Sequence, residues 1–318
     1  MARRGKKGRA VNGIFLLDKP LELSSNSAMQ RVRRLFDANK AGHTGALDPL
    51  ATGLLPICLG EATKFSQYLL DSDKRYTATF ALGVATESGD RDGAVVSQAS
   101  AAHLTEVQVV DAMASFEGET DQVPSMFSAL KHNGQPLYKL ARQGIEVERP
   151  ARRITLHHYR LLAFRSGEVA EIEVDVHCSK GTYVRTLATD LGELLGVGAH
   201  VTALRRTAAG PFALADAYTP ERLTTLVADS GSSGADHTLL PMEIAVQGAL
   251  DVQLPKASEL FFSQGQPVAA SEAYRNGQEA GIVRVFAEDG RFLGVATVTD
   301  DGLVAPKRLV LYPTGEKD

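Results

Sequence analysis

The chain has 318 residues, of which 44% are hydrophobic, and its formal net charge at neutral pH is −4. A chain of this length and apolar content can bury a full core and is expected to form two domains. No stretch reaches the roughly 20 consecutive apolar residues of a membrane span, and the apolar run at residues 14–17 is far shorter than a signal peptide requires. We therefore expect a soluble cytoplasmic protein.

The charge is unevenly distributed along the chain. Residues 1–215 hold 26 Lys and Arg against 23 Asp and Glu, whereas residues 216–318 hold 8 against 15. Many of the basic side chains cluster near the N-terminus: Arg3, Arg4, Lys6, Lys7, Arg9, Arg31, Arg33, Arg34 and Lys40. Such a basic face could bind a polyanion such as nucleic acid, although an ordinary solvated surface accounts for the charge equally well.

Hydrophobic patterning predicts the elements of the first half of the chain. Ser24 or Ser25 can cap a helix whose apolar positions Met29, Val32 and Phe36 share one face. The other expected elements, in chain order, are a strand at residues 13–18, a helix at 61–70, a strand at 75–84, a polar turn at 87–93 that brings Asp90 near the end of that strand, and a helix at 105–116.

Residues 40–64 form a glycine- and proline-rich segment, and Asp48 is the acid that lies among these glycines and prolines. Gly45 and Gly53 permit backbone conformations closed to other residues, and Pro49 pushes Asp48 out of the helical region. The sequence predicts a structured loop that presents one partly shielded carboxylate, which suits nucleophilic catalysis. On Asp-Pro alone, an acid that merely turns the chain is the commoner explanation.

The second half predicts an α+β domain on a mixed, largely antiparallel sheet flanked by helices. Residues 124–153 are basic and broken by Pro and Gly, which indicates a mobile excursion from the fold. Residues 170–178 alternate apolar and polar side chains, which is typical of a strand with one buried face. A helix that contains Tyr183 and Arg185 in its first turn and ends at Gly196 follows, then a strand at residues 200–207.

Composition changes again near residue 228. The segment 229–249 begins with a Ser- and Gly-rich stretch and is predicted to be a flexible linker between a catalytic domain at residues 1–228 and a small domain at 250–314. Short β-rich segments separated by Asp-Gly turns predict a small barrel in the last part.

The sequence offers no evidence for a cofactor or a metal. It has no Walker loop, no dinucleotide fingerprint and no His-Glu-x-x-His helix. Cys58 and Cys178 occur singly in apolar segments and are expected to be buried free thiols. His157 and His158 are adjacent on an expected strand, so they should point to opposite faces and be unable to bind one metal ion.

Five motifs resemble those of the bacterial TruB family of tRNA pseudouridine-55 synthases, in the same order along the chain. They are GHTGALDPLATG at residues 42–53, GEATK at 60–64, KRY at 74–76, PSMFSALK at 124–131 and CSKGTYVR at 178–185. The resemblance covers nearly the whole chain, and the twelve-residue motif with its acid is highly specific. It reverses the preference for a merely structural Asp48.

The resemblance implies that the chain isomerises one uridine in the T-loop of tRNA without cofactor or metal, after flipping the base out of the RNA. It implies that Asp48 is the nucleophile. The implied roles of the other residues are base stacking by Tyr76, pocket walls from Tyr183 and Leu204, pairing of Arg185 with the nucleophile, RNA contact by His43, support of Arg185 by Asp90, and support below the site by Lys19, Pro20 and Lys64. It also implies a C-terminal PUA-like RNA-binding domain and a T-arm partner, and we expect a monomer that is not bound to a membrane.

One departure from the family pattern follows Pro20, where a glycine is common two residues on and this chain has Glu22. We expect the turn there to be shaped differently. Two other functions stay open: a non-catalytic module that binds or folds tRNA, and a carboxylate enzyme such as a glycosidase. A glycosidase would need a second acid about 5–10 Å from Asp48.

Overall fold

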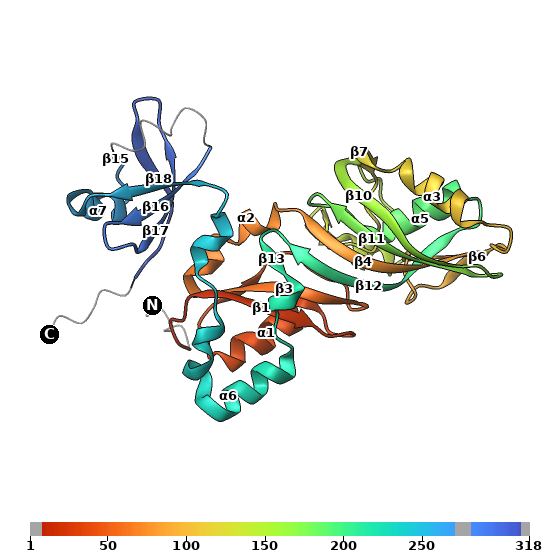
Figure 1. Cartoon of the computed structure of the whole chain (residues 1–318), viewed down its shortest axis with the longest axis horizontal. Coiled ribbons are helices and arrows are strands. Elements are labelled where there is room, and N and C mark those ends of the chain that lie inside the picture. The colour runs from red at the N-terminus through yellow and green to blue at the C-terminus, as the bar shows by residue number, and fades with distance from the viewer. Residues whose placement is uncertain (1–7, 271–280, 313–318) are drawn as a thin grey trace.

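The computed structural model describes residues 8–270 and 281–312. Of the basic side chains near the N-terminus, Arg3, Arg4, Lys6 and Lys7 lie outside these residues, as do parts of the predicted 250–314 domain. Figure 1 shows an elongated molecule with a large domain and a smaller one at one end. No helix among the described residues combines the length and the apolar character needed to cross a membrane.

The large domain is built on a nine-stranded sheet. Its main path is β1 (Gly13–Lys19), β3 (Ala51–Leu59), β12 (Ala199–Ala209), β4 (Lys74–Leu82), β11 (Ala170–Cys178), β10 (Arg152–Arg165) and β7 (Gly118–Gln122), with β2 (Ala41–His43) beside β3 and β13 (Phe212–Ala213) beside β12. Every pairing is antiparallel except that of β3 with β12. The predicted mixed, largely antiparallel α+β fold is confirmed.

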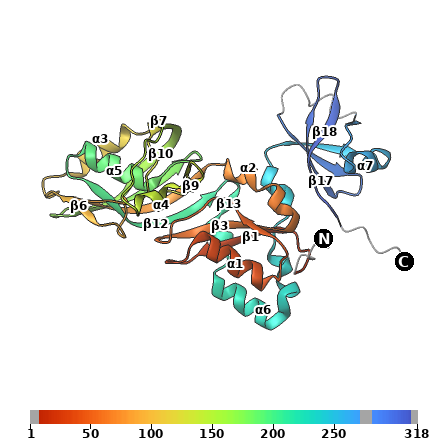
Figure 2. The same ribbon diagram turned by 180° about the vertical axis from the view of Figure 1, so that it is seen from behind.

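Helices cover the two halves of this sheet. Helices α1 (Ser25–Leu35) and α6 (Pro220–Gly234) pack on each other near β1, whereas α3 (Glu106–Ala114) and α5 (Val184–Leu194) lie on the half that contains β10, β11 and β4 (Figure 1 and Figure 2). The predicted cap of α1 is Ser24, whose hydroxyl accepts a hydrogen bond from the Ser27 amide. Strand β11 has the predicted bounds and a strictly alternating burial pattern.

The glycine-rich segment 40–64 is less of a loop than its composition predicts, because residues 51–59 form a buried strand of the sheet. Pro56 is tolerated because it lies between the stretch of β3 that pairs with β12 and the stretch that pairs with β2. Gly53 has φ +99°, and a side chain there would collide with the Arg206 main chain of β12. The expected helix at 61–70 is divided at Phe65 into η1 (Gly60–Lys64) and α2 (Ser66–Leu70).

The segment 229–249 is not a flexible linker. It continues α6 past a kink at Gly231, forms the helical turns η3 (Ala235–Thr238) and η4 (Met242–Val246), and pairs with β1 through Leu240. Met242 and Val246 are buried in a core shared with the large domain. Packing against that domain orders a stretch whose Ser and Gly content predicts flexibility.

The C-terminal domain is a curled five-stranded sheet, as predicted for a small barrel-like domain. It contains β14 (Leu250–Leu254), β16 (Val283–Ala287), β17 (Phe292–Val298), β18 (Leu303–Leu309) and β15 (Val268–Ala269), together with an unpredicted helix α7 (Lys256–Ser263). The Phe65 and Phe292 ring centroids lie 5.2 Å apart across the junction of the domains. The junction is therefore a packed apolar contact.

Two smaller units project from the large sheet. Strands β5 (Val84–Thr86) and β6 (Val95–Gln98) form a hairpin around the predicted polar turn. Elsewhere, the short helical turn η2 (Leu214–Asp216) precedes α6. The basic segment 124–153 contains β8 (Lys131–His132), β9 (Gln135–Pro136) and α4 (Leu137–Ala141). Met126, Leu137 and Leu140 give it a small core of its own.

Candidate active site

Asp48 lies in the loop between β2 and β3, and three contacts fix the backbone around it. The Ser25 hydroxyl accepts from the Leu47 amide at 2.7 Å and donates to the Leu47 carbonyl at 2.9 Å. The Glu22 amide donates to the Pro49 carbonyl at 2.8 Å. The first turn of α1 and the turn after β1 therefore hold the loop on both sides of the acid.

Arg185, in the first turn of α5, pairs with Asp48. Its Nε lies 3.0 Å from Asp48 Oδ2, and its Nη1 lies 3.4 Å from Asp90 Oδ2. The same guanidinium donates to the Ser88 and Phe127 carbonyls at 3.0 and 2.8 Å. Only 5% of the arginine side chain is exposed, against 41% for Asp48, so the acid faces the solvent side of the pair.

Burial and the neighbouring arginine have opposite effects on the pKa of Asp48. Burial raises the pKa of Asp48, while the Arg185 charge and hydrogen bond act to lower it and the nearby Asp90 charge raises it further. Removing the arginine would therefore shift the carboxyl toward its protonated form. Arg185 therefore acts as a counter-ion that favours the ionised form of Asp48 against the effect of burial.

Asp48 opens onto a pocket of about 350 Å³. Tyr76 of β4, Leu204 of β12 and Tyr183, the N-cap of α5, line it together with Asp48 and Arg185. The structure thus brings together segments that are separated by up to 156 positions, between Asp48 and Leu204. Asp48 is the only acid among the described residues that line the pocket, and no histidine or cysteine is among them, so they form no metal-ligand set.

Three buried polar lining residues, Lys74, Ser128 and Arg206, had no assigned role from the sequence. Arg206 is almost fully buried and donates to the Leu54 carbonyl at 2.6 Å and the Gly45 carbonyl at 3.2 Å. Lys74 donates to the Leu70 and Ser72 carbonyls, and burial lowers its pKa to about 8. Ser128 has a buried hydroxyl with no hydrogen-bond partner among the described residues.

A signal for Arg206 is present in the sequence, where a double arginine follows Leu204 in a strand. Alternation along the strand places one of the two arginines on the pocket side. Arg206 is the partner of Tyr76 across the β4–β12 ladder, and its charge acts on the tyrosine. Arg206 therefore connects the Asp48 loop to the tyrosine of the pocket.

Lys19 lies beneath the site at the end of β1 and has no exposed surface. Its ammonium donates to the Pro20 carbonyl at 2.9 Å and the Leu23 carbonyl at 2.7 Å, which closes the turn after β1. Glu22 in this turn has φ +64°, the left-handed conformation that favours glycine. The departure from the family pattern at Glu22 therefore keeps a glycine-type backbone at the cost of local strain.

His43 and Lys64 do not line the pocket. His43 lies on β2, with a buried Nδ1 that has no hydrogen-bond partner among the described residues, and burial followed by the Arg206 charge lowers its pKa. Lys64 pairs with Glu61 and donates to the Leu309 carbonyl at 2.8 Å. Lys64 is thus a contact between the two domains.

A second hollow of about 440 Å³ lies behind Arg185, between the polar turn and the segment 124–153. Its lining includes Ser88, Phe127 and Arg185. Because the Phe127 carbonyl accepts from Arg185, the basic segment touches the counter-ion of Asp48 directly.

Solved structures with similar folds include "Structure of H/ACA RNP bound to a substrate RNA containing 2'-deoxyuridine", with a TM-score of 0.69, 22% identity and coverage of 98% of this chain and 92% of the other. A second is "Crystal Structure of a Cbf5-Nop10-Gar1 Complex", with a TM-score of 0.65, 23% identity and coverage of 90% and 78%. The fold is that of the pseudouridine synthases.

Sequence comparison narrows this class. The TruB family pseudouridylate synthase N-terminal domain matches residues 33–184, the tRNA pseudouridylate synthase B C-terminal domain matches 185–247, and the pseudouridine synthase II TruB C-terminal domain matches 251–310. The tRNA pseudouridine synthase B of Saccharophagus degradans is 54% identical over 98% of this chain and 99% of its own length. That of Yersinia pestis is 52% identical over 98% and 96%. The chain belongs to the TruB family of pseudouridylate synthases.

Proposed function

We propose that the protein is a tRNA pseudouridine synthase that isomerises the T-loop uridine at position 55. The observation that carries the proposal is the Asp48–Arg185 pair at the mouth of a tyrosine-lined pocket in a TruB-family chain. The names of relatives at 52–54% identity support tRNA as the substrate. The T-arm and the exact position come from the motif resemblance.

The reaction breaks the N1–C1′ bond of uridine and joins C5 to C1′, so that a proton leaves C5 and N1 gains one. The proton lost from C5 to solvent is balanced by the one gained at N1, so the composition of the nucleotide is unchanged and no oxidant or reductant is needed, which supports a reaction without cofactor or metal. Asp48 can attack the base, attack the sugar or remove a sugar proton, because an ionised carboxylate is competent in each role. Arg185 keeps the carboxylate ionised in all three.

The target base must first leave the RNA stack, which costs a few kcal/mol. We assign Tyr76 to stack on the flipped base, which can recover about 1–3 kcal/mol. Leu204 and Tyr183 would form the walls of the pocket, and the unpartnered Ser128 hydroxyl is placed to offer a hydrogen bond to the base. Asp90 would hold Arg185 from behind, and Lys19 with Pro20 would support the Asp48 loop from below.

RNA outside the pocket would meet three other parts of the chain. His43 would contact the opened loop, the basic segment 124–153 would close on the arm beside Arg185, and the PUA-like C-terminal domain would bind more distant RNA. The acidic balance of residues 216–318 limits that last contribution to a local patch. A cytoplasmic monomer completes the proposal.

The two alternatives are weaker. A glycosidase would present a second acid to the substrate, whereas Asp90 is buried behind Arg185 and is absent from the pocket lining. A non-catalytic tRNA module would have no need for a carboxylate held at a pocket by a buried arginine. We therefore prefer catalysis.

The test uses tRNA arms that carry tritium at C5 of uridine, because isomerisation releases that label. We expect release from a T-arm stem-loop, none from the same arm with cytidine at the target position, and none from an anticodon arm of equal length. Binding of each arm is measured in parallel. T-arm binding without release would indicate the non-catalytic module, and release from the anticodon arm would contradict the assigned substrate.

A further inference from the structure

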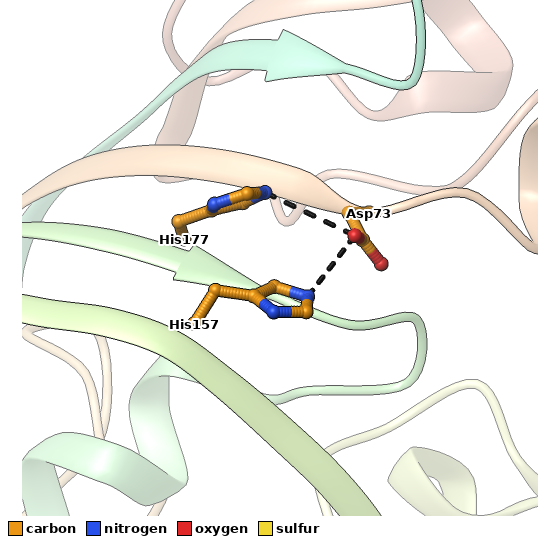
Figure 3. A group of neighbouring side chains, drawn as sticks. All are labelled: Asp73, His157 and His177. Atoms are coloured by element: carbon orange, nitrogen blue, oxygen red, sulfur yellow. Dashed lines mark ion pairs between the residues drawn. The ribbon is translucent and has the colours of Figure 1, made fainter. Parts of the chain in front are cut away.

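A second cluster of polar side chains lies outside the pocket, where the C-terminal end of β11 lies beside β10. Asp73, just before β4, meets His157 of β10 and His177 of β11 (Figure 3). Asp73 Oδ2 lies 3.0 Å from His157 Nε2 and 3.9 Å from His177 Nε2, and the potential ligand atoms all lie within 4.8 Å of one another. Two imidazole nitrogens therefore converge on one carboxylate oxygen.

The expectation that His157 and His158 point to opposite faces is wrong, because a β-bulge interrupts β10 at this point. In this antiparallel pair Leu156 lies opposite Cys178 and His158 lies opposite the adjacent His177. His157 is therefore the inserted residue and has no partner in the ladder. A bulge redirects the inserted residue. Both adjacent rings contact His177, with centroids 4.5 Å away for His157 and 5.5 Å for His158, so they lie on the same face.

We propose that Asp73, His157 and His177 form a binding site for a divalent transition-metal ion of the Zn²⁺ type. Two imidazoles and one carboxylate are typical ligands for such an ion, whereas Ca²⁺ and Mg²⁺ prefer oxygen ligands alone. Tetrahedral Zn²⁺ ligands lie roughly 3.4 Å apart, from metal–ligand distances of about 2.0–2.2 Å. The distances from Asp73 Oδ2 to the two histidine nitrogens, 3.0 and 3.9 Å, lie on either side of that value. Small rotations of the two imidazoles would bring the ligand atoms to tetrahedral spacing.

The surroundings of the cluster both favour and oppose a cation. His158 Nε2 lies 2.7 Å from Asp175 Oδ2, so this neighbouring histidine is already paired with a carboxylate of its own beside the site. The Arg75 charge acts on His177 and opposes a cation. Arg75 is exposed, on a long side chain that can turn toward solvent, whereas the two histidines are placed by the neighbouring strands β10 and β11.

A bound ion would tie the loop before β4 to β10 and β11. Asp73 precedes Lys74, which lines the active-site pocket, but none of the three ligands lines it. The ion would therefore fix the base of β4 rather than take part in the reaction. The site is independent of the proposed function and can be tested without RNA.

The test is a titration of the untagged full-length protein with Zn²⁺ in competition with a chromophoric chelator, followed by Co²⁺ as a spectroscopic probe. We expect one equivalent of Zn²⁺ to bind, and the Co²⁺ complex to show visible d–d absorption. Each of the variants His157→Ala, His177→Ala and Asp73→Asn should weaken binding by about tenfold or more, a loss at least as large as that from removing an outer-shell partner. Zn²⁺ should also raise the Tm of the wild type and not of these variants.

The matched controls are His158→Ala, which removes the neighbouring ring, and His237→Ala, which removes an exposed histidine elsewhere. Both should keep Zn²⁺ affinity within about threefold, since neither residue is an assigned ligand. The proposal is overturned if the wild type binds no Zn²⁺, or if the ligand variants bind it as tightly as the wild type. A loss in His158→Ala equal to that in His157→Ala would overturn the assigned ligand set.

Discussion

Arg185 meets Asp48 through Nε, at 3.0 Å, while its two terminal nitrogens are engaged by the Ser88 and Phe127 carbonyls and by Asp90. One planar guanidinium thus binds Asp48, the polar turn and the basic segment at once. A lysine has the same charge but cannot reproduce that planar arrangement.

We therefore expect Arg185→Lys to lower the single-turnover rate by about 100-fold or more, because lysine cannot hold Asp48 in the same position and a misplacement of about 1 Å can cost that much. The measurement is tritium release under enzyme excess. The control is Arg205→Lys, which alters a half-exposed arginine paired with Asp18 outside the pocket lining. A wild-type rate for Arg185→Lys would show that its geometry is not needed.

Tyr76 is buried in the pocket and lies opposite Arg206 in the β4–β12 ladder. Tyr76→Leu should abolish detectable turnover while lowering RNA affinity less than about tenfold, because phosphate contacts outside the pocket dominate affinity. Tyr76→Phe keeps the stacking ring and should retain far more activity than Tyr76→Leu. Equal activity of the two variants would remove stacking as the role of this residue.

The strained turn at Glu22 gives a prediction for stability. An L-residue in the left-handed conformation costs about 1–2 kcal/mol, and glycine relieves this at a cost of about 0.5–1 kcal/mol through the unfolded state. Glu22→Gly should therefore change the free energy of unfolding by less than about 1 kcal/mol, whereas Glu22→Val should lower it clearly. Urea midpoints that rank valine equal to glycine would show that the turn is relaxed.

Burial lowers the pKa of Lys19 from 10.5 to about 8. Between these values the unfolded chain binds the proton more tightly than the folded chain, so this group adds stability as the pH rises. The wild type should gain stability over Lys19→Met by at most about 1.4 kcal/mol per pH unit in this range. Urea unfolding of both proteins at several pH values measures the difference, and parallel curves would contradict a buried charged Lys19.

The sequence predicts the fold best where local pattern and tertiary position agree. The alternation in β11 and the Ser24 cap are local signals that the structure retains. The strand at residues 51–59 is not predicted from the sequence, because glycine and proline normally mark loops. Its pairing with β1 and β12 is what makes this segment a strand. The segment 229–249 is wrongly predicted to be a flexible linker for a similar reason. Burial of Met242 and Val246 against the large domain orders it despite its Ser and Gly content.

The candidate site depends on contacts that no single segment encodes. Motif resemblance located Asp48, Tyr76, Tyr183 and Arg185, which the structure places around one pocket. Arg206 and Ser128 were missed because their importance comes from burial against other segments. The bulge at His157 is likewise a property of pairing with β11, which strand periodicity alone does not reveal.

The central claim is that the Asp48 carboxylate performs the isomerisation. The most direct test is Asp48→Asn, which keeps the size of the side chain and removes its charge, assayed for tritium release from a T-arm whose binding is measured in the same samples. We predict T-arm binding close to that of the wild type and no release of tritium, even after prolonged incubation. Release at the wild-type rate from Asp48→Asn would contradict the account.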